Sequence, residues 1–257
     1  MRVIVIGNEK GGAGKSTVAT HVAIGLAHEG ARVAVLDLDR RQQSTAHFFS
    51  NRARWIEANH AALPQPLAVA DAVDPAALEG ALAEAASADF LVIDTPGSDT
   101  DLSRAAHRIA DLIVTPMNDS FVDFDVLGVV DPVTLDLVRA GLYAETVWEA
   151  RKARAAQRGR SLDWVVLRNR LASADPRNRR RVDERLMALS RRVGFRVLPG
   201  LRDRVIYREL FPFGLTVSDL GPGVRPIPVS MGHIAARQEL QALMADLGLT
   251  HSAMAAE

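Results

Sequence analysis

The chain has no cysteine among its 257 residues, so disulfide bridges, thiolate nucleophiles and cysteine-bound iron–sulfur clusters are excluded. No apolar run approaches the roughly 20 residues that a membrane-spanning helix needs. The chain begins in a strand pattern, with no leader in which charged residues precede an apolar run. These absences favour a cytoplasmic protein.

The net charge is zero, but the charges are unevenly distributed along the chain. Residues 1–150 hold 11 basic and 21 acidic residues, whereas residues 151–257 hold 20 and 10. The arginines of residues 151–208 suggest an anionic partner for this half of the chain. A solvated basic surface is the alternative interpretation.

Apolar, β-branched runs alternate with stretches of helical periodicity, which predicts an α/β fold with a doubly wound, mostly parallel sheet flanked by helices. Without repeats or long linkers, we expect a single domain over residues 1–257. We predict strands at Arg2–Ile6, Arg32–Leu36, Leu67–Val69, Phe90–Ile93, Leu112–Thr115, Trp164–Leu167 and Phe195–Leu198. We predict helices at Lys15–Glu29, Ser44–Asn59, Pro75–Ala86, Leu102–Ile109, Asp123–Arg139, Pro176–Val193, Val205–Leu210 and Met231–Leu247.

The most specific motif is a glycine-rich segment that follows the first predicted strand and opens a helix. Glycines let successive backbone N–H groups point at phosphate oxygens, and the helix N-terminus adds its positive dipole end. In this pattern Lys15 neutralises the β- and γ-phosphates, Ser16 ligates Mg²⁺ and Thr17 donates to the α-phosphate. A glycine-rich turn that merely precedes a helix is the alternative. The predicted cradle consists of Gly11, Gly12, Ala13, Gly14, Lys15, Ser16 and Thr17.

The segment departs from the ordinary phosphate loop at Glu9, where that pattern has glycine, and it has a second lysine, Lys10. In this deviant Walker A form it resembles the ParA/MinD superfamily of ATPases. The resemblance implies a homodimer that forms when ATP is bound, in which Lys10 reaches the nucleotide of the other subunit. Such a cation resembles an arginine finger and couples hydrolysis to dimerisation.

Three aspartates end two of the predicted strands. Asp37 and Asp39 follow the second strand, and Asp94 ends the fourth; ligands of parallel sheets bind beyond these ends. Asp94 matches the Walker B position and is expected to hold Mg²⁺ directly or through water. The resemblance implies that Asp39 orients the attacking water and that Asp37 supports the metal shell. The alternative is that these aspartates cap the helices that follow, which is left open above all for Asp37.

The base pocket is predicted at the end of the Trp164–Leu167 strand. Guanine-specific enzymes carry Asn-Lys-x-Asp there, whereas this chain has Asn169 without the lysine or the aspartate. The pattern resembles the adenine-binding strand end of the ParA/MinD group, which favours ATP. Pro199 and Leu201 are expected to close over the other side of the base.

Within the superfamily, several stretches along the chain resemble the MipZ family of division-site placement ATPases. This implies a regulator that binds double-stranded DNA without sequence preference, is recruited by ParB, inhibits FtsZ assembly, and associates with the nucleoid with enrichment toward the cell poles. The last predicted helix lacks a basic face, so no membrane contact is expected. The stretches are residues 8–10, 115–125, 147–149, 163–170 and 200–214.

Arginines beside the apolar stripe of the Pro176–Val193 helix are candidate DNA contacts. Arg177 and Arg181 lie on one band of that helix, and Arg202 belongs to the next element. Contacts to phosphates would be independent of sequence and sensitive to salt.

Two other functions remain open. A ParA-type ATPase that segregates chromosomes or plasmids would share the same chemistry. A metabolic P-loop enzyme, such as an amidotransferase-like ligase or a relative of dethiobiotin synthetase, would need a substrate pocket, and the second lysine of the loop argues against it.

Overall fold

Seven parallel strands form the central sheet of the computed structural model, which describes residues 1–118, 124–131, 134, 136–169, 176–221, 223–224, 226–228 and 230–250. The strands are β1 (Arg2–Ile6), β2 (Val33–Asp37), β3 (Ala68–Asp71), β4 (Phe90–Asp94), β5 (Leu112–Asn118), β8 (Asp163–Asn169) and β9 (Arg196–Pro199). Their order across the sheet is β3-β2-β4-β1-β5-β8-β9, and every neighbouring pair is parallel. The predicted parallel α/β sheet is confirmed.

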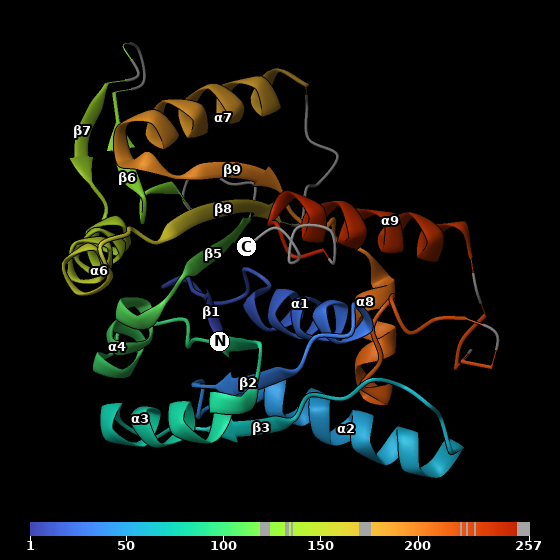
Figure 1. Cartoon of the computed structure of the whole chain (residues 1–257). Helices are drawn as coiled ribbons and strands as arrows, with labels where there is room; N and C mark the ends of the chain where they lie inside the picture. The colour runs from blue at the N-terminus through green and yellow to red at the C-terminus, as the bar shows by residue number, and fades with distance from the viewer. Residues whose placement is uncertain are drawn as a thin grey trace.

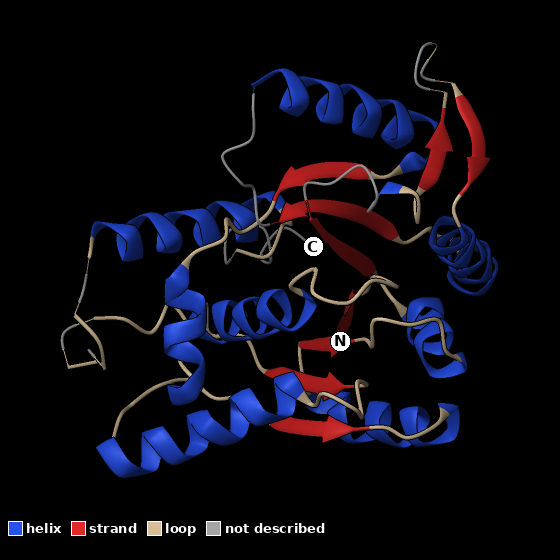
Figure 2. Cartoon of the chain, turned by 180° about the vertical axis from the view of Figure 1, so that it is seen from behind, coloured by secondary structure: helices blue, strands red, loops and turns tan. Residues whose placement is uncertain are grey.

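Helices cover both faces of the sheet (Figures 1 and 2). Successive strand side chains point to opposite faces, so Ile4 and Ile6 enter one apolar core while Val3 and Val5 enter the other. Both faces are therefore buried, as the near-continuous apolar strands require. The first core is covered by α1 (Lys15–His28), α2 (Ser44–Asn59), α8 (Val205–Leu210) and α9 (Met231–Asp246); the second by α3 (Pro75–Glu84), α4 (Asp101–Ile109), α6 (Leu142–Arg158) and α7 (Pro176–Leu189).

The helix predicted over Asp123–Arg139 is wrong. A hairpin lies there instead, in which β6 (Gly128–Val130) pairs antiparallel with β7 (Leu137–Ala140), and α6, which we did not predict, follows it. The two strands stand beside α6 and α7 at the upper left of Figure 1.

Turn residues explain this difference. Asp131 precedes a proline, which cannot continue a helix, and its carboxylate accepts a hydrogen bond from Thr134 N at 2.8 Å. At the start of α6, a Cβ atom on Gly141 would lie 2.1 Å from the carbonyl oxygen of Val126, so only glycine fits there. The β-branched pair Val129 and Val130 thus belongs to a strand, although its spacing also suits an amphipathic helix.

The apolar stripe predicted for α7 is present in its described half, where Leu186 and Leu189 are buried in the second core. Short helical turns follow α3, α7 and α8, at Ala85–Ser87, Ser190–Gly194 and Phe211–Phe213. Across the described ranges, no helix has the length and the apolar character needed to traverse a membrane.

Candidate functional site

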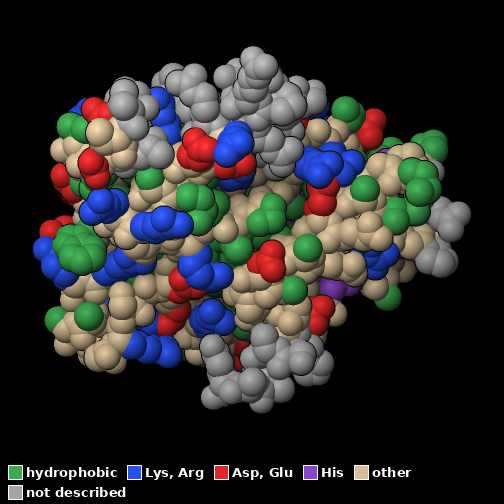
Figure 3. Space-filling model, turned by 90° about the horizontal axis from the view of Figure 1, so that it is seen from above, with side chains coloured by type: hydrophobic (Ala, Val, Ile, Leu, Met, Phe, Trp, Pro, Cys, Tyr) green, Lys and Arg blue, Asp and Glu red, His purple; other side chains and the backbone are tan. Residues whose placement is uncertain are grey.

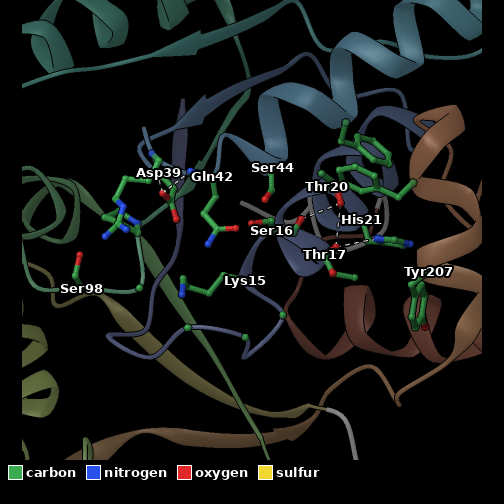
Figure 4. A pocket seen from close by; sticks show the side chains of 18 residues that line it. Lys15, Ser16, Thr17, Thr20, His21, Asp39, Gln42, Ser44, Ser98 and Tyr207 are labelled. Atoms are coloured by element: carbon green, nitrogen blue, oxygen red, sulfur yellow. Dashed lines mark hydrogen bonds between the residues drawn. The ribbon is translucent and has the colours of Figure 1, made fainter.

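The glycine-rich loop between β1 and α1 forms the floor of a cleft of about 480 Å³ at the carboxyl ends of the strands. Gly12 and Gly14 have φ values of 74° and 88°, in the left-handed region that favours glycine. A Cβ atom on Gly14 would lie 2.3 Å from Nδ2 of Asn169, so a side chain there would also clash. Figure 4 shows Asp39 and Ser98 at one end of this cleft and His21 and Tyr207 at the other.

Lys15 opens α1 and lines this cleft. Its ammonium donates a hydrogen bond to the carbonyl oxygen of Lys10 at 2.8 Å, so the two lysines of the loop are directly connected. Burial lowers the pKa of Lys15, while the carboxylates of Asp94 and Asp39 act in the opposite direction. The site therefore holds a cation among anionic groups, as a phosphate-binding lysine requires.

Asp94 ends β4 and is 1% exposed. Its Oδ2 accepts a hydrogen bond from the Thr45 hydroxyl at 2.7 Å, whereas Oδ1 has no hydrogen-bond partner among the described residues. Burial raises the pKa of Asp94 to about 7, against the opposing effects of the Ser16 and Thr45 hydroxyls. A neighbouring cation would favour the ionised form.

The oxygen atoms at Asp94 and Ser16 are suitable ligands for Mg²⁺. The Ser16 hydroxyl and the unpaired Oδ1 of Asp94 are hard oxygen ligands, and Mg²⁺ in nucleotide sites takes its remaining ligands from waters and phosphates. In the part of the chain that the structure describes, no three His, Asp or Glu side chains cluster so as to hold a metal ion by themselves. Such a metal would thus bind together with a nucleotide.

Asp37 and Asp39 organise the loop that leads into α2. The carboxylate oxygens of Asp37 accept hydrogen bonds from three backbone N–H groups. The donors are Asp39 at 2.9 Å, and Thr45 and Ala46 at 3.0 Å each. Burial raises the pKa of Asp37, and these hydrogen bonds oppose the shift. Asp37 thus makes the helix-start contacts weighed above as the capping alternative, and it lies opposite Asp94 on the neighbouring strand, with Thr45 bound to both carboxylates.

Asp39 lines the cleft itself. Its Oδ1 accepts hydrogen bonds from the backbone N–H groups of Arg41 at 3.2 Å and of Gln42 at 3.1 Å. This turn fixes the carboxylate on the side of the cleft that also contains Ser98 (Figure 4).

A second cleft of about 240 Å³ adjoins the first and is lined by Asn169, Leu201 and Arg202. Asn169 Nδ2 donates to the Ala13 carbonyl oxygen at 2.9 Å, while its Oδ1 is buried and accepts no hydrogen bond from any described residue. An amide oxygen accepts hydrogen bonds, so it can receive an N–H donor such as an amino group. Pro199, at the end of β9, lines neither cleft.

Several residues of the site were not predicted from the sequence, among them His21, Thr45 and Tyr207. His21 lies one turn after Thr17 on α1, so helical periodicity could have placed it at the cleft. Tyr207 lies in residues 200–214, a stretch that indicated the family but gave no role for this tyrosine. No local pattern pointed to Thr45, because its partner Asp94 belongs to a distant strand.

Some arginines in the basic half of the chain, residues 151–257, form ion pairs with acidic side chains. Arg202 pairs with Glu239 at 3.4 Å, and Arg168 pairs with Asp183. On the face that carries α7, basic and acidic side chains are interspersed (Figure 3). Arg177 and Arg181 belong to α7, but their side chains lie outside the described part, as do residues 119–123 and 170 of the family-like stretches.

Comparison with known proteins places this geometry in a family. Residues 2–251 match the family model described as ATPase MipZ. The chain is 30% identical to ParA of Rhizobium radiobacter over 48% of this chain and 51% of ParA. It is 32% identical to the chromosome-partitioning ATPase Soj of Thermus thermophilus over 55% of this chain and 64% of Soj. The chain thus spans about half the length of ParA.

The fold also matches a solved structure. The complex of Cyanothece McdA with ATP has a TM-score of 0.63 to this chain, with 16% sequence identity and 96% of both chains covered. At that identity the likeness concerns the fold alone, a parallel sheet flanked by helices.

Proposed function

This chain belongs to the MipZ family of ATPases, and from that membership we propose that it hydrolyses ATP as a switch between monomer and ATP-bound homodimer. The observation that carries the proposal is the contact between the two loop lysines, in which the Lys10 carbonyl oxygen holds the Lys15 ammonium. Any movement of Lys10 toward a second subunit would therefore also act on the phosphate-binding lysine.

Each part of the site then has a role. The backbone of Gly11, Gly12, Ala13 and Gly14, with Lys15 and Thr17, holds the phosphates. Ser16 and Asp94 hold Mg²⁺, which would offset charge on the phosphate oxygens, and Asp37 supports this shell through Thr45.

Asp39 orients the attacking water at the cleft, and Lys10 stabilises charge across the dimer interface. Asn169 receives the amino group of adenine, and Leu201 belongs to the wall around the base, whereas the predicted contact of Pro199 is not retained because Pro199 lines neither cleft. Hydrolysis is then fast only where two loaded subunits meet.

We further propose that the dimer binds double-stranded DNA without sequence preference, that ParB recruits the protein, and that it positions the division site by inhibiting FtsZ assembly. Arg177, Arg181 and Arg202 would supply the DNA contacts, and the protein would be cytoplasmic, held on the nucleoid with enrichment toward the poles. Local sequence similarity to ParA and Soj supports a second candidate, a segregation ATPase with the same chemistry.

The test of the switch is ATP turnover per subunit, measured without any co-substrate over a range of protein concentrations. We expect turnover to rise cooperatively with protein concentration and to disappear in Lys15→Ala. Turnover that is independent of concentration, or that requires a small-molecule substrate, contradicts the proposal. FtsZ polymers that disassemble on addition of protein and ATP, and not of protein and ADP, would favour division-site placement over segregation.

A further inference from the structure

The two clefts of the site meet at four residues that line both of them: Gly14, Thr17, Tyr207 and Phe211. The phosphate loop lines the first cleft, and Asn169 lines the second. In a nucleotide, the ribose joins the α-phosphate to the base. A nucleotide that spans both clefts therefore places its ribose where they meet.

Tyr207 reaches this junction from α8. Its hydroxyl is buried and has no hydrogen-bond partner within the described ranges. Burial raises the pKa of Tyr207, and the nearby Glu239 acts in the same direction, so the hydroxyl keeps its proton. It is a hydrogen-bond donor that lacks an acceptor.

His21, on α1, lines the first cleft and packs against Tyr207. Its Nδ1 lies 2.8 Å from the Thr17 carbonyl oxygen, which can only accept, so Nδ1 carries the ring proton. Burial lowers the pKa of His21 to about 4, so the ring is neutral near pH 7. The remaining nitrogen, Nε2, is thus an acceptor, and it is buried without a partner in the described chain.

The two rings touch. Their centroids are 5.0 Å apart and their planes are inclined by 88°, an edge-to-face arrangement that fixes each against the other. Figure 4 shows both residues at the same end of the cleft, away from Asp39 and Ser98. A residue with a free donor and a residue with a free acceptor, among the described residues, are therefore in contact at the same end of the first cleft.

Buried polar groups in folded proteins nearly always have partners. A group that pairs with both residues must accept a hydrogen bond from Tyr207 and donate one to Nε2 of His21. Phosphate oxygens only accept, so they do not fit the imidazole. A hydroxyl does both.

We propose that Tyr207 and His21 recognise a hydroxyl of the nucleotide ribose, Tyr207 by donating to it and His21 by accepting from it. This inference rests on the proposed ATP site and deepens it, because it makes the site selective for ATP over the deoxy analogue that lacks the recognised hydroxyl. Tyr207 is the contact residue that distinguishes them, and His21 both contacts the sugar and positions the tyrosine ring.

The test compares the affinities of ATP, 2′-deoxy-ATP and 3′-deoxy-ATP for the full chain and for Tyr207→Phe, which keeps the ring and its contact with His21. We expect the wild type to bind ATP about three- to tenfold more tightly than the analogue that lacks the recognised hydroxyl. In Tyr207→Phe the affinity for ATP falls, and the ratio of ATP to that analogue decreases to the part that the remaining contact with His21 supplies.

Tyr143→Phe, a change of the other tyrosine on the opposite face of the sheet, should leave the ratio at its wild-type value. The proposal is overturned if the wild type binds all three nucleotides equally, or if Tyr207→Phe keeps the wild-type ratio. Failure of the wild type to bind any of them would instead reject the ATP site itself. The wild-type comparison needs no substitution, so a folding defect in the variant cannot obscure it.

Discussion

The Thr45 hydroxyl donates a hydrogen bond to Oδ2 of Asp94 at 2.7 Å, across 49 positions of the chain. The backbone N–H of Thr45 in turn donates to Asp37 at 3.0 Å. Thr45 therefore connects the two strand-end aspartates and leaves Oδ1 of Asp94 as the oxygen that no described residue engages.

Thr45→Val is expected to weaken the Mg²⁺ dependence of ATP turnover. The substitution keeps the shape of the side chain but removes the donor that orients Asp94, and loss of such a supporting contact costs about 10- to 100-fold in metal affinity. The measurement is the Mg²⁺ concentration that gives half-maximal turnover. Thr45→Ser, which keeps the hydroxyl, should stay near the wild type; a wild-type Mg²⁺ curve for Thr45→Val would contradict the role of this contact.

Asp39→Ala is expected to remain a dimer with ATP, because ATP binds but is not hydrolysed, whereas Lys10→Ala should fail to sustain hydrolysis. Size-exclusion chromatography with light scattering, in ATP and in ADP, measures the first effect. A mixture of the two variants tests whether Lys10 acts on the nucleotide of the other subunit. If it does, each mixed dimer contains one complete site and ATP turnover returns. Two inactive variants that stay inactive when mixed would exclude a shared site.

Arg177→Ala combined with Arg181→Ala is expected to abolish DNA co-sedimentation while ATP turnover changes little. The loss of two phosphate contacts should reduce the slope of log affinity against log salt by about two per subunit. Arg32→Ala provides the control, because this exposed arginine pairs with Asp89 at 2.7 Å before β2, away from α7. Unchanged DNA binding in the double variant would refute these contacts.

The contribution of His21 to stability is expected to fall as the pH decreases from about 6.5 to 4, whereas Asp94, whose pKa is raised to about 7, contributes in the opposite direction over this range. Burial lowers the pKa of His21 from 6.5 to about 4, so over this range the unfolded chain takes up a proton that the folded chain does not. The free energy of unfolding of the wild type relative to His21→Asn should therefore decrease by up to about 1.4 kcal/mol per pH unit, with no change from this group above pH 6.5. Urea unfolding at pH 7, 6 and 5 measures it.

His21→Asn should lose less stability than the wild type as the pH decreases, while the contributions of His107 and Asp94 remain in both proteins and cancel in the comparison. His60→Asn, at an exposed position, is the matched control. An identical pH dependence in His21→Asn and the wild type would show that His21 titrates in the same range in both states.

The amino-acid sequence by itself determined the seven strands of the sheet and the position of the phosphate loop. Both follow from local rules, since buried parallel strands read as short apolar runs and the glycines before Lys15 allow the backbone to curve around an anion. Because parallel strands end at one edge, Asp94 and Asn169 could also be assigned to the same site before their contacts were known.

Only the tertiary structure decided which residues complete that site. Thr45 meets Asp94, and His21 meets Tyr207, through helices that pack from distant parts of the chain, and no periodicity encodes such pairs. The hairpin of β6 and β7 was misread for a related reason: its valines suit either a strand or a helix, and the close packing of Gly141 against Val126 settles the choice.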